Sequence, residues 1–394
     1  MGYRRTKRYP QRRNNRFGQN RRKRNDQKIN VSLFINRAKL DSENPEKVFV
    51  PDNLFSDFAL SSALVEFLSK NGYKNPTPIQ DQIIGPILEG KDVVGLANTG
   101  TGKTAAFLIP LIEMSLKKPD GQILIIAPTR ELALQVNKEL SLIIGHVGLF
   151  STVCVGGENM RNQMRKLKFK NHFIVGTPGR LLDLVKRGHI ILGNIDKIVL
   201  DEADRMLDMG FIKDIRLLLN HAPANRQTLC FSATMSSKTE VLISEFLKDP
   251  ITVSVKTREI PGNIEQDVIS IRNLNKIDVL YDLLQGVEFK KVLVFGSTKR
   301  GVETLSKNLS RKGMLVESIH GDKNQTQRKK ALLKFKENRV KVLIATDVAA
   351  RGIHINDISH VINYEIPESY DDYVHRIGRT GRGVQKGKAL TFVK

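Results

Sequence analysis

From residue 55 onward, short apolar segments of strand length alternate with longer segments whose apolar residues recur at a helical period. Such an alternation lays the strands side by side in a parallel sheet and covers that sheet with helices. The pattern therefore predicts an α/β fold. Strands are expected first at 93–96, 123–127, 152–155, 173–175, 197–200 and 228–232.

The alternation lapses between residues 254 and 265 and then resumes. This stretch contains a Pro-Gly pair and several charged residues, which are typical of a linker. The 394 residues therefore form two predicted α/β domains, at 54–253 and 266–394. In the second domain, helices such as 275–285 and 326–337 separate strands that are expected at 267–271, 291–295, 315–319, 341–345, 360–363 and 388–393.

A glycine-rich loop follows the first predicted strand and precedes a helical segment. Residues 97–104 are Ala-Asn-Thr-Gly-Thr-Gly-Lys-Thr, whereas the strict phosphate-loop pattern begins with Gly. Glycines let the backbone wrap a phosphate, and the helix N-terminus adds N–H donors. A glycine turn that opens an ordinary helix is the alternative. The loop predicts a nucleoside triphosphate on Thr99, Gly100, Thr101, Gly102 and Lys103, with Thr104 on Mg²⁺.

An acidic pair follows another predicted strand. Asp201 and Glu202 come directly after an apolar segment, so both carboxylates are expected at the carboxyl end of a buried strand, where open α/β sheets bind ligands. Asp201 can hold the metal ion, and Glu202 can orient or deprotonate an attacking water. An acidic pair at a strand end is often a solvated turn. Its occurrence downstream of the glycine loop favours the nucleotide site.

The charge of the chain is strongly basic. With 64 Lys and Arg against 41 Asp and Glu, the formal net charge is +23, which requires a polyanionic partner or a strong reason of solubility. Residues 1–28 hold 12 of the basic residues and a single acid. Because residues 1–30 are almost free of apolar side chains, this basic arm is predicted to be disordered. Aromatic residues among its arginines favour a nucleic-acid-binding arm over a solubilising tail.

Two further expectations come from composition. Cys154 and Cys230 lie in apolar segments of strand type, so we expect buried, free thiols and neither a disulfide nor a metal site. No segment approaches 18 consecutive apolar residues, and no apolar segment follows the basic N-terminus. We therefore expect no transmembrane helix, no secretory signal and no membrane partner.

With these motifs in place, the chain resembles the DEAD-box family of ATP-dependent RNA helicases over about residues 54–394. The loop that begins with Ala97 has the form used in this family. The resemblance implies two RecA-like domains in tandem that bind ATP and Mg²⁺ in the cleft between them. It rests on motifs that occur in the family's order at 72–80, 97–104, 128–133, 156–157, 177–180, 201–204, 232–234, 294–298, 321–328, 345–352 and 375–382.

The segment at 72–80 looks like the family's adenine-binding element. A glutamine amide can pair with adenine N6 and N7, which suits Gln80, and Tyr73 offers an aromatic face. Phe55 belongs to the same element by resemblance. Considered alone, Gln80 is better explained as a surface helix residue.

Several residues just beyond predicted strand ends suit RNA backbone. A hydroxyl, a guanidinium or a bare glycine N–H can bind phosphate oxygens and the 2′-OH without contacting the bases, which predicts sequence-independent RNA binding. Helix capping and turn chemistry are the alternative. The candidates are Thr129, Arg130, Gly157, Thr177 and Arg180, and the resemblance adds Pro128, Gly296 and Thr346.

Arg379 and Arg382 lie three residues apart beside glycines and are candidate arginine fingers supplied by the second domain. A solvated basic turn is the alternative.

The family usually has Asp where this chain has His354. The imidazole of His354 can bond a ribose hydroxyl, and the alternative is that the fold tolerates a change at this position. The resemblance also implies coupling between domains through Asp204, Ser232, Thr234, Asp347, Arg351 and His375.

The predicted function is RNA-dependent ATP hydrolysis that drives local separation of RNA strands. A DNA helicase or translocase of the same build and an ATP-gated RNA clamp are the rival hypotheses. The resemblance implies a monomeric core with ribosomal or RNA-decay proteins as partners. It also implies a cytoplasmic location if the source is bacterial, which the short core favours, and a nuclear or nucleolar one if it is eukaryotic.

Overall fold

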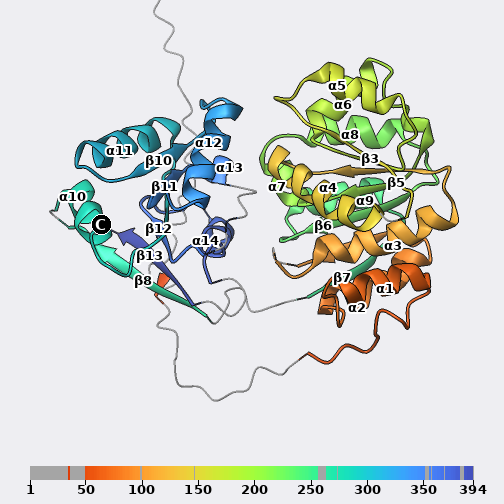
Figure 1. The fold of residues 1–394 in the computed structure, drawn as a ribbon, viewed down its shortest axis with the longest axis horizontal. Coiled ribbons are helices and arrows are strands. Elements are labelled where there is room, and N and C mark those ends of the chain that lie inside the picture. Colours follow the sequence, from red (N-terminus) through yellow and green to blue (C-terminus); the bar gives the residue numbers. More distant parts are fainter. Residues whose placement is uncertain are drawn as a thin grey trace, which may run out of the picture.

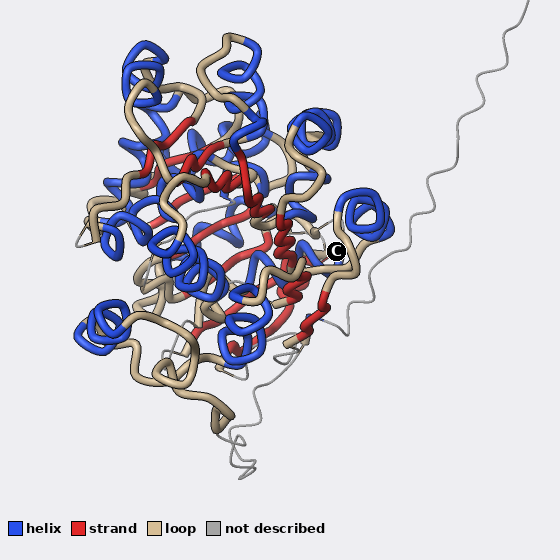
Figure 2. The backbone as a smooth tube through the Cα atoms, turned by 90° about the vertical axis from the view of Figure 1, so that its right-hand side faces the viewer, coloured by secondary structure: helices blue, strands red, loops and turns tan. Residues whose placement is uncertain are grey.

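The computed structural model describes residues 34–35, 49–97, 100–145, 147–255, 263–272, 274–350, 355, 357–367, 369–381 and 386–393. The basic arm predicted over 1–30 lies outside these residues. Two lobes, one for each run of alternating strands and helices, lie side by side (Figure 1). In each lobe the strands run through the interior and the helices lie outside them (Figure 2).

A parallel sheet forms the centre of the first lobe. Its strand order within the described residues is β3-β4-β2-β5-β6-β1-β7, and every pair is parallel. The strands are rich in Val, Ile and Leu because both faces of a parallel sheet are covered. They are β1 (Val93–Leu96), β2 (Gln122–Ile126), β3 (Ser151–Cys154), β4 (Phe173–Gly176), β5 (Ile195–Leu200), β6 (Gln227–Ser232) and β7 (Ile251–Ser254).

Helices cover both faces of this sheet and make two cores. In β2, Ile123 and Ile125 pack into one core, whereas Leu124 and Ile126 pack into the other, as the alternation of strand side chains requires. The first core lies under α1 (Ser62–Lys70), α2 (Pro78–Leu88), α3 (Lys103–Lys117) and α4 (Arg130–Ile144). The second lies under α5 (Met160–Leu167), α6 (Pro178–Lys186), η2 (Leu192–Asn194), α7 (Ala203–Asp208), α8 (Ile212–His221) and α9 (Ser237–Phe246).

The second lobe repeats this plan with the strand order β10-β11-β9-β12-β13-β8, again parallel throughout. Its strands are β8 (Ile264–Ser270), β9 (Val292–Phe295), β10 (Val316–Ile319), β11 (Val342–Ala345), β12 (His360–Asn363) and β13 (Gly387–Val393). One face packs under α10 (Lys276–Leu284) and α11 (Lys299–Arg311), and the other under α12 (Gln325–Lys336), α13 (Asp347–Ala350) and α14 (Tyr370–Ile377).

The predicted α/β fold with two tandem parallel sheets is confirmed, and each expected strand occurs within three residues of its predicted start. The sequence did not predict β7. This four-residue strand lies at the sheet edge with Thr252 and Ser254 exposed, and its apolar-polar alternation is short and directly precedes the predicted linker. The predicted linker at 254–265 overlaps strands at both ends, because Ser254 belongs to β7 and residues 264 and 265 belong to β8.

The two thiols agree with the expectation of buried, free cysteines. Cys154 and Cys230 are free and wholly buried, and burial raises the pKa of each thiol to about 12. Thiols that stay protonated are inert. Among the described residues, no helix is both long enough and apolar enough to cross a bilayer.

Candidate functional site

The glycine loop connects β1 to α3 at the carboxyl edge of the first sheet. Gly100 and Gly102 adopt φ of +89° and +93°, which side chains rarely adopt. Lys103 is buried at the start of α3, and its Nζ donates to the Ala97 carbonyl oxygen at 2.6 Å. The loop is therefore shaped around backbone groups, and Lys103 folds back across it. The predicted phosphate-binding residue Thr99 lies outside the described residues, whereas Thr101 and Thr104 are half-buried.

The acidic pair lies at the end of β5, at the same carboxyl edge of the sheet as the glycine loop, with β6 between β5 and β1. Asp201 is buried, and burial together with the charge of Glu202 raises its pKa to about 7. A divalent cation beside this carboxylate would favour its ionised form. In the described part of the chain, no group of three or more His, Cys, Asp or Glu is arranged to hold a metal ion. The donor set fits Mg²⁺, which commonly uses one or two protein ligands together with phosphate oxygens and water.

Glu202 adopts a strained backbone conformation and is paired with a residue that the sequence did not single out. Its φ is +53°, which is rare for a side-chain-bearing residue and is found where function requires it. The Glu202 carboxylate accepts a hydrogen bond from Arg205 Nη1. Burial opposes ionisation of Glu202, but Arg205, with Lys103 and Arg379, holds its pKa below the usual value. The spacing of three residues on one helix could have suggested this pair.

The predicted adenine element packs largely against the protein itself. Gln80 lies at the third position of α2, where its Oε1 accepts from the Thr77 backbone N–H at 2.9 Å. Its Nε2 donates to the Gly102 carbonyl at 3.1 Å, so Gln80 ties α2 to the glycine loop. Phe55 is 4% exposed and meets Tyr73 edge to face, with ring centroids 6.4 Å apart. The Phe55 side chain thus belongs to the hydrophobic core of the first lobe.

The second lobe brings positive charge toward Glu202. Arg379 is buried just after α14 and is close enough to lower the Glu202 pKa across the two lobes. A small cavity beside it is lined from both lobes, by Arg205 of α7 and by His375, Arg376 and Arg379 of the second lobe. Burial, then the charge of Arg205, lowers the pKa of His375 to about 4, so this imidazole is neutral near pH 7. The predicted site residues Arg382, Arg351 and His354 lie outside the described residues.

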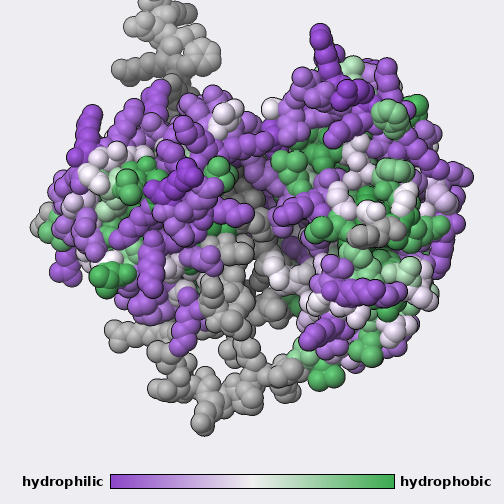
Figure 3. Space-filling model, in the orientation of Figure 1, coloured by the Kyte–Doolittle hydropathy of each residue, from purple (hydrophilic) through white to green (hydrophobic). Residues whose placement is uncertain are grey.

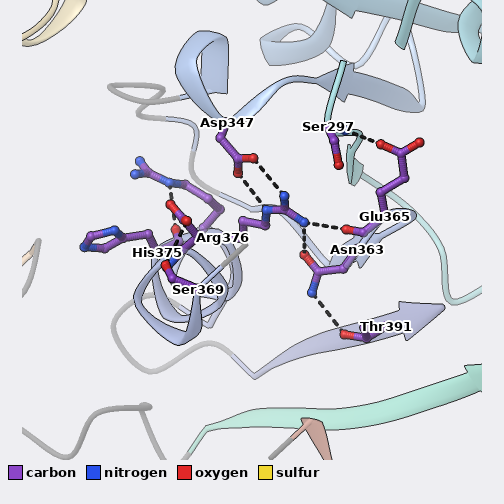
Figure 4. Close-up of polar contacts among 10 residues, drawn as sticks. Ser297, Asp347, Asn363, Glu365, Ser369, His375, Arg376 and Thr391 are labelled. Atoms are coloured by element: carbon purple, nitrogen blue, oxygen red, sulfur yellow. Dashed lines mark hydrogen bonds and ion pairs between the residues drawn. The ribbon is translucent and has the colours of Figure 1, made fainter. Parts of the chain in front are cut away.

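Arg376 organises the sheet edge of the second lobe, and sequence reasoning did not assign it a role. Its Nε and Nη2 donate to the two carboxylate oxygens of Asp347 at 2.6 and 2.7 Å (Figure 4). Its Nη1 donates to Asn363 Oδ1 at 3.2 Å and to the Glu365 carbonyl at 2.7 Å. The guanidinium stacks near the Phe295 ring, 5.1 Å from its centroid. Asp347 is therefore fixed inside the second lobe.

The predicted coupling residues of the first lobe, Asp204, Ser232 and Thr234, are joined by hydrogen bonds around the turn that follows β6. Asp204 Oδ2 accepts from the backbone N–H groups of Ala233 and Thr234 and from Thr234 Oγ1, at 2.9 to 3.1 Å. Ser232 Oγ donates to the Thr234 carbonyl at 2.7 Å. The acidic segment after β5 is thus bonded directly to the turn after β6.

The candidate RNA-binding residues all lie at the carboxyl edges of the two sheets, where they follow β2, β3, β4, β9 and β11. Thr129 caps α4 by accepting from the Leu132 N–H at 3.3 Å. Arg130 is buried and bonds the Gly156 carbonyl and Glu158, and Arg180 Nη1 donates to Gln163 at 2.8 Å. The remaining candidates are Pro128, Gly157 (φ +72°), Thr177, Gly296 and Thr346.

A second contact between lobes lies beside these residues and was not predicted. Gln325 Nε2 donates to Glu131 Oε1 at 3.4 Å, and Arg328 Nη2 lies 3.8 Å from the same oxygen. A Cβ added to Gly157 would lie 3.0 Å from Gln325 Cγ. The start of α4 and the start of α12 therefore meet across the two lobes.

Family models match both lobes. The DEAD/DEAH box helicase family matches residues 77–242, and the helicase conserved C-terminal domain matches residues 275–384. The chain is similar to the DEAD-box ATP-dependent RNA helicase CshA of Bacillus subtilis, with 46% identity over 341 residues, which are 86% of this chain and 69% of the relative. The same protein from Geobacillus kaustophilus is 45% identical over 86% of this chain and 73% of its own length.

Two solved structures share the fold and differ in how well they superimpose. Saccharomyces cerevisiae Dbp5 bound to RNA and ADP BeF3 is 31% identical, with a TM-score of 0.78 over 86% of this chain and 89% of that one. A DEAD box protein from Methanococcus jannaschii is 39% identical, with a TM-score of 0.51 over 86% of this chain and 93% of that one.

Proposed function

The chain belongs to the DEAD/DEAH-box helicase family, and from this premise we propose that it is an ATP-dependent RNA helicase that separates short RNA duplexes. A cavity lined by Arg205 of the first lobe, which is paired with Glu202, and by His375 and Arg379 of the second lobe carries the proposal. An acid of one lobe and an arginine of the other act on one site only when the lobes are close together. ATP hydrolysis and lobe closure are therefore parts of one process.

The ATP site is assigned to the carboxyl edge of the first sheet. The phosphates are placed against the left-handed glycines, with Lys103 exchanging the Ala97 carbonyl for a phosphate oxygen. Thr104 and Asp201 would hold Mg²⁺, which neutralises charge on the phosphate oxygens when bound. Glu202, kept ionised by Arg205, orients the attacking water and accepts its proton. Arg379 stabilises the charge that develops on the transferred phosphoryl group.

Lobe closure is supported by the two solved structures. Both cover 86% of this chain, yet the chain superimposes better on the RNA- and nucleotide-bound Dbp5 than on the more identical archaeal protein. Since both structures cover the same share of this chain, the difference in TM-score favours a different placement of the two lobes in the two relatives. An arrangement close to that of the RNA-bound relative puts Arg379 beside Glu202. ATP and RNA each contribute contacts to this closed state and therefore bind cooperatively.

RNA is assigned to the strand ends that carry Thr129, Gly157, Thr177, Gly296 and Thr346. Hydroxyls and backbone N–H groups bind phosphates and 2′-OH groups, which gives sequence-independent binding. Hydrophilic side chains cover most of the second lobe on the face in Figure 3. Stacking contributes about 1.4 kcal/mol per base-pair step, by analogy with DNA. Separating a few pairs costs several kcal/mol, which closure can supply for short duplexes.

Finer assignments follow from the same proposal. The domains extend over 54–253 and 266–394, and residues 1–30 act as a basic RNA-binding arm. The core works as a monomer in the cytoplasm with Mg²⁺ as the metal ion. Its partners are ribosomal or RNA-decay proteins, in ribosome biogenesis or RNA decay.

Steady-state ATP hydrolysis by the full chain tests the proposal. We expect strong stimulation by single-stranded RNA and little by DNA of the same sequence, because the 2′-OH distinguishes the two. Glu202→Gln should lower RNA-stimulated turnover by about 10²- to 10⁴-fold and keep ATP-dependent RNA binding. Glu245→Gln is the control, since Glu245 forms an exposed pair with Arg216. Equal stimulation by DNA would support the DNA translocase, and unchanged turnover in Glu202→Gln would refute the assignment of Glu202.

A further inference from the structure

A residue that precedes the first lobe in sequence is buried in the second lobe. Phe34 has no exposed surface, although it lies well upstream of α1. It packs with Ile264 of β8, Tyr373 and Ile377 of α14, and Ala389 of β13. We call these five residues the Phe34 cluster. All its other members belong to the second lobe, more than 200 positions away in the sequence.

The cluster is an ordered aromatic contact. The rings of Phe34 and Tyr373 lie 4.7 Å apart at an interplanar angle of 56°, a favoured tilted arrangement. Tyr373 is fixed from the other side, because its hydroxyl donates to Gln266 Oε1 at 2.8 Å. Phe34 thus meets side chains that the second lobe already holds in place.

The topology explains why the second lobe has a surface for this ring. Strand β8 lies at the sheet edge, beside β13, and α14 is only eight residues long. Ile264 and Ala389 point to the face covered by α14, and Phe34 covers the part of this face next to Ile264. The neighbouring Ile35 is 46% exposed, so the burial is specific to residue 34.

The cluster also touches the turn that carries Arg379. A Cβ added to Gly381 would lie 2.5 Å from Ile264 Cγ1, so this turn lies directly on Ile264. Asn263, next to Ile264, donates from Nδ2 to the Gly381 carbonyl at 2.8 Å. Ile264 therefore contacts both Phe34 and the segment just after Arg379.

We propose that the Phe34 cluster is an intramolecular docking site that ties the N-terminal segment to the second lobe beside the Arg379 turn. The lobes are then connected twice, once through residues 256–262 and once through the chain from Phe34 to the first lobe. The six peptide units between residue 28 and Phe34 span at most about 21 Å. Docking therefore anchors the end of the basic segment 1–28 within that distance of the second lobe, where RNA binds according to the proposed function.

Fluorescence tests docking without any reference to helicase activity. The sequence contains no Trp, so Phe34→Trp and Ile35→Trp each give the full chain a single Trp reporter. We expect blue-shifted emission protected from acrylamide for Phe34→Trp, and solvent-exposed emission for Ile35→Trp. Equal exposure of both reporters would overturn the proposal. A blue shift that grows with protein concentration would also overturn it, because it would place Phe34 in a second copy of the chain.

Hydrogen exchange of Phe34→Ala covers the case in which the larger Trp does not fit. Loss of the ring should speed amide exchange in α14 and β8 by about tenfold or more, with Ile35→Ala unchanged. Unchanged exchange in Phe34→Ala would refute docking. For the consequence that rests on the proposed function, Phe34→Ala should raise the RNA concentration for half-maximal ATPase and leave maximal turnover within about twofold. An unchanged RNA requirement would refute this role and leave ATPase activity itself established.

Discussion

The two lobes share one architecture but use the carboxyl edges of their sheets differently. In the first lobe this edge combines left-handed glycines, a strained Glu202 and a buried Asp201 with a raised pKa. In the second lobe the corresponding edge is filled by Arg376, whose nitrogens bond Asp347, Asn363 and Glu365. The hydrogen bonds of the first edge join groups of the proposed ATP site, such as Lys103 and the Ala97 carbonyl, whereas those of the second edge hold Asp347 inside the lobe.

This difference shows how a repeated fold divides one reaction. When a ligand binds, a group such as Lys103 must exchange its internal hydrogen bond for one to the ligand, because a buried polar group without a partner is costly. The second lobe contributes His375 and Arg379 to a cavity that Arg205 of the first lobe also lines. We therefore propose that the first lobe binds the nucleotide and that Arg379 of the second lobe promotes its hydrolysis, which the following substitutions test.

Arg379→Ala should have the largest effect on activity. It removes the positive charge that the second lobe brings to Glu202, and arginine fingers contribute about 10³-fold or more to turnover. RNA-stimulated ATPase should fall by about that factor, while denaturant titrations of the second lobe change little. Arg311→Ala, at the exposed end of α11, is the control. If ATPase turnover fell only a fewfold, Arg379 would not be the group through which the second lobe promotes hydrolysis.

Arg376→Ala should instead damage stability. It leaves Asp347 without its bidentate partner and removes the bonds to Asn363 and Glu365, so we expect a loss of about 3–5 kcal/mol. Hydrogen exchange should localise the loss to β9, β11 and β12 and leave the strands of the first lobe protected. Lys299→Ala, which breaks an exposed pair with Asp322, should cost below about 1 kcal/mol. Equal loss of protection in both lobes would contradict the comparison.

The sequence predicted the strands, the glycine loop and the acidic pair because each of them is local. Strand-length apolar segments and the residues that follow them define a sheet edge without any knowledge of distant contacts. It did not predict the roles of Arg205 and Arg376, because their partners are set by tertiary packing. The ligand roles predicted for Arg130 and Gln80 stay predictions, and the sequence did not indicate their bonds to Gly156 and Gly102.

The same limit explains β7 and Phe34. Ile251 to Ser254 alternate between apolar and polar residues, but four residues beside the linker are too few to identify β7 as a strand. Phe34 precedes the recognisable domains and packs against residues more than 200 positions away. The local sequence alone is not sufficient to assign either feature, since each depends on which surface of the folded protein remains to be covered.

His375 should make lobe closure depend on pH. Its pKa is about 4 when it is buried beside Arg205, against about 6.5 in solvent. An open state that exposes His375 binds a proton below pH 6.5, whereas the closed state does not. Closure is therefore fully favoured above pH 6.5 and weakens as the pH falls toward 4.

ATP-dependent RNA affinity should thus drop by up to about tenfold per pH unit below 6.5, measured by fluorescence anisotropy with a non-hydrolysable nucleotide. His375→Gln cannot take up this proton, and its affinity should vary less across the same range. His221→Gln is the control, because His221 is exposed at the end of α8. If His375→Gln kept the full pH dependence of RNA affinity, proton uptake by the His375 imidazole would not be its cause.

The smallest effect is expected at the contact between α4 and α12. Glu131 lies 3.4 Å from Gln325 Nε2 and 3.8 Å from Arg328 Nη2, and about a fifth of both charged side chains is exposed. Because solvent weakens such a pair, Glu131→Gln should lower ATP-dependent RNA affinity only about two- to fivefold and leave the stability of each lobe unchanged. A double-mutant cycle with Arg328→Ala isolates the contact, and Asp183→Asn, in an exposed pair within the first lobe, is the control. Additive effects would mean that these helices do not contribute to closure, and the coupling between the lobes would then depend on the Arg379 side of the cleft alone.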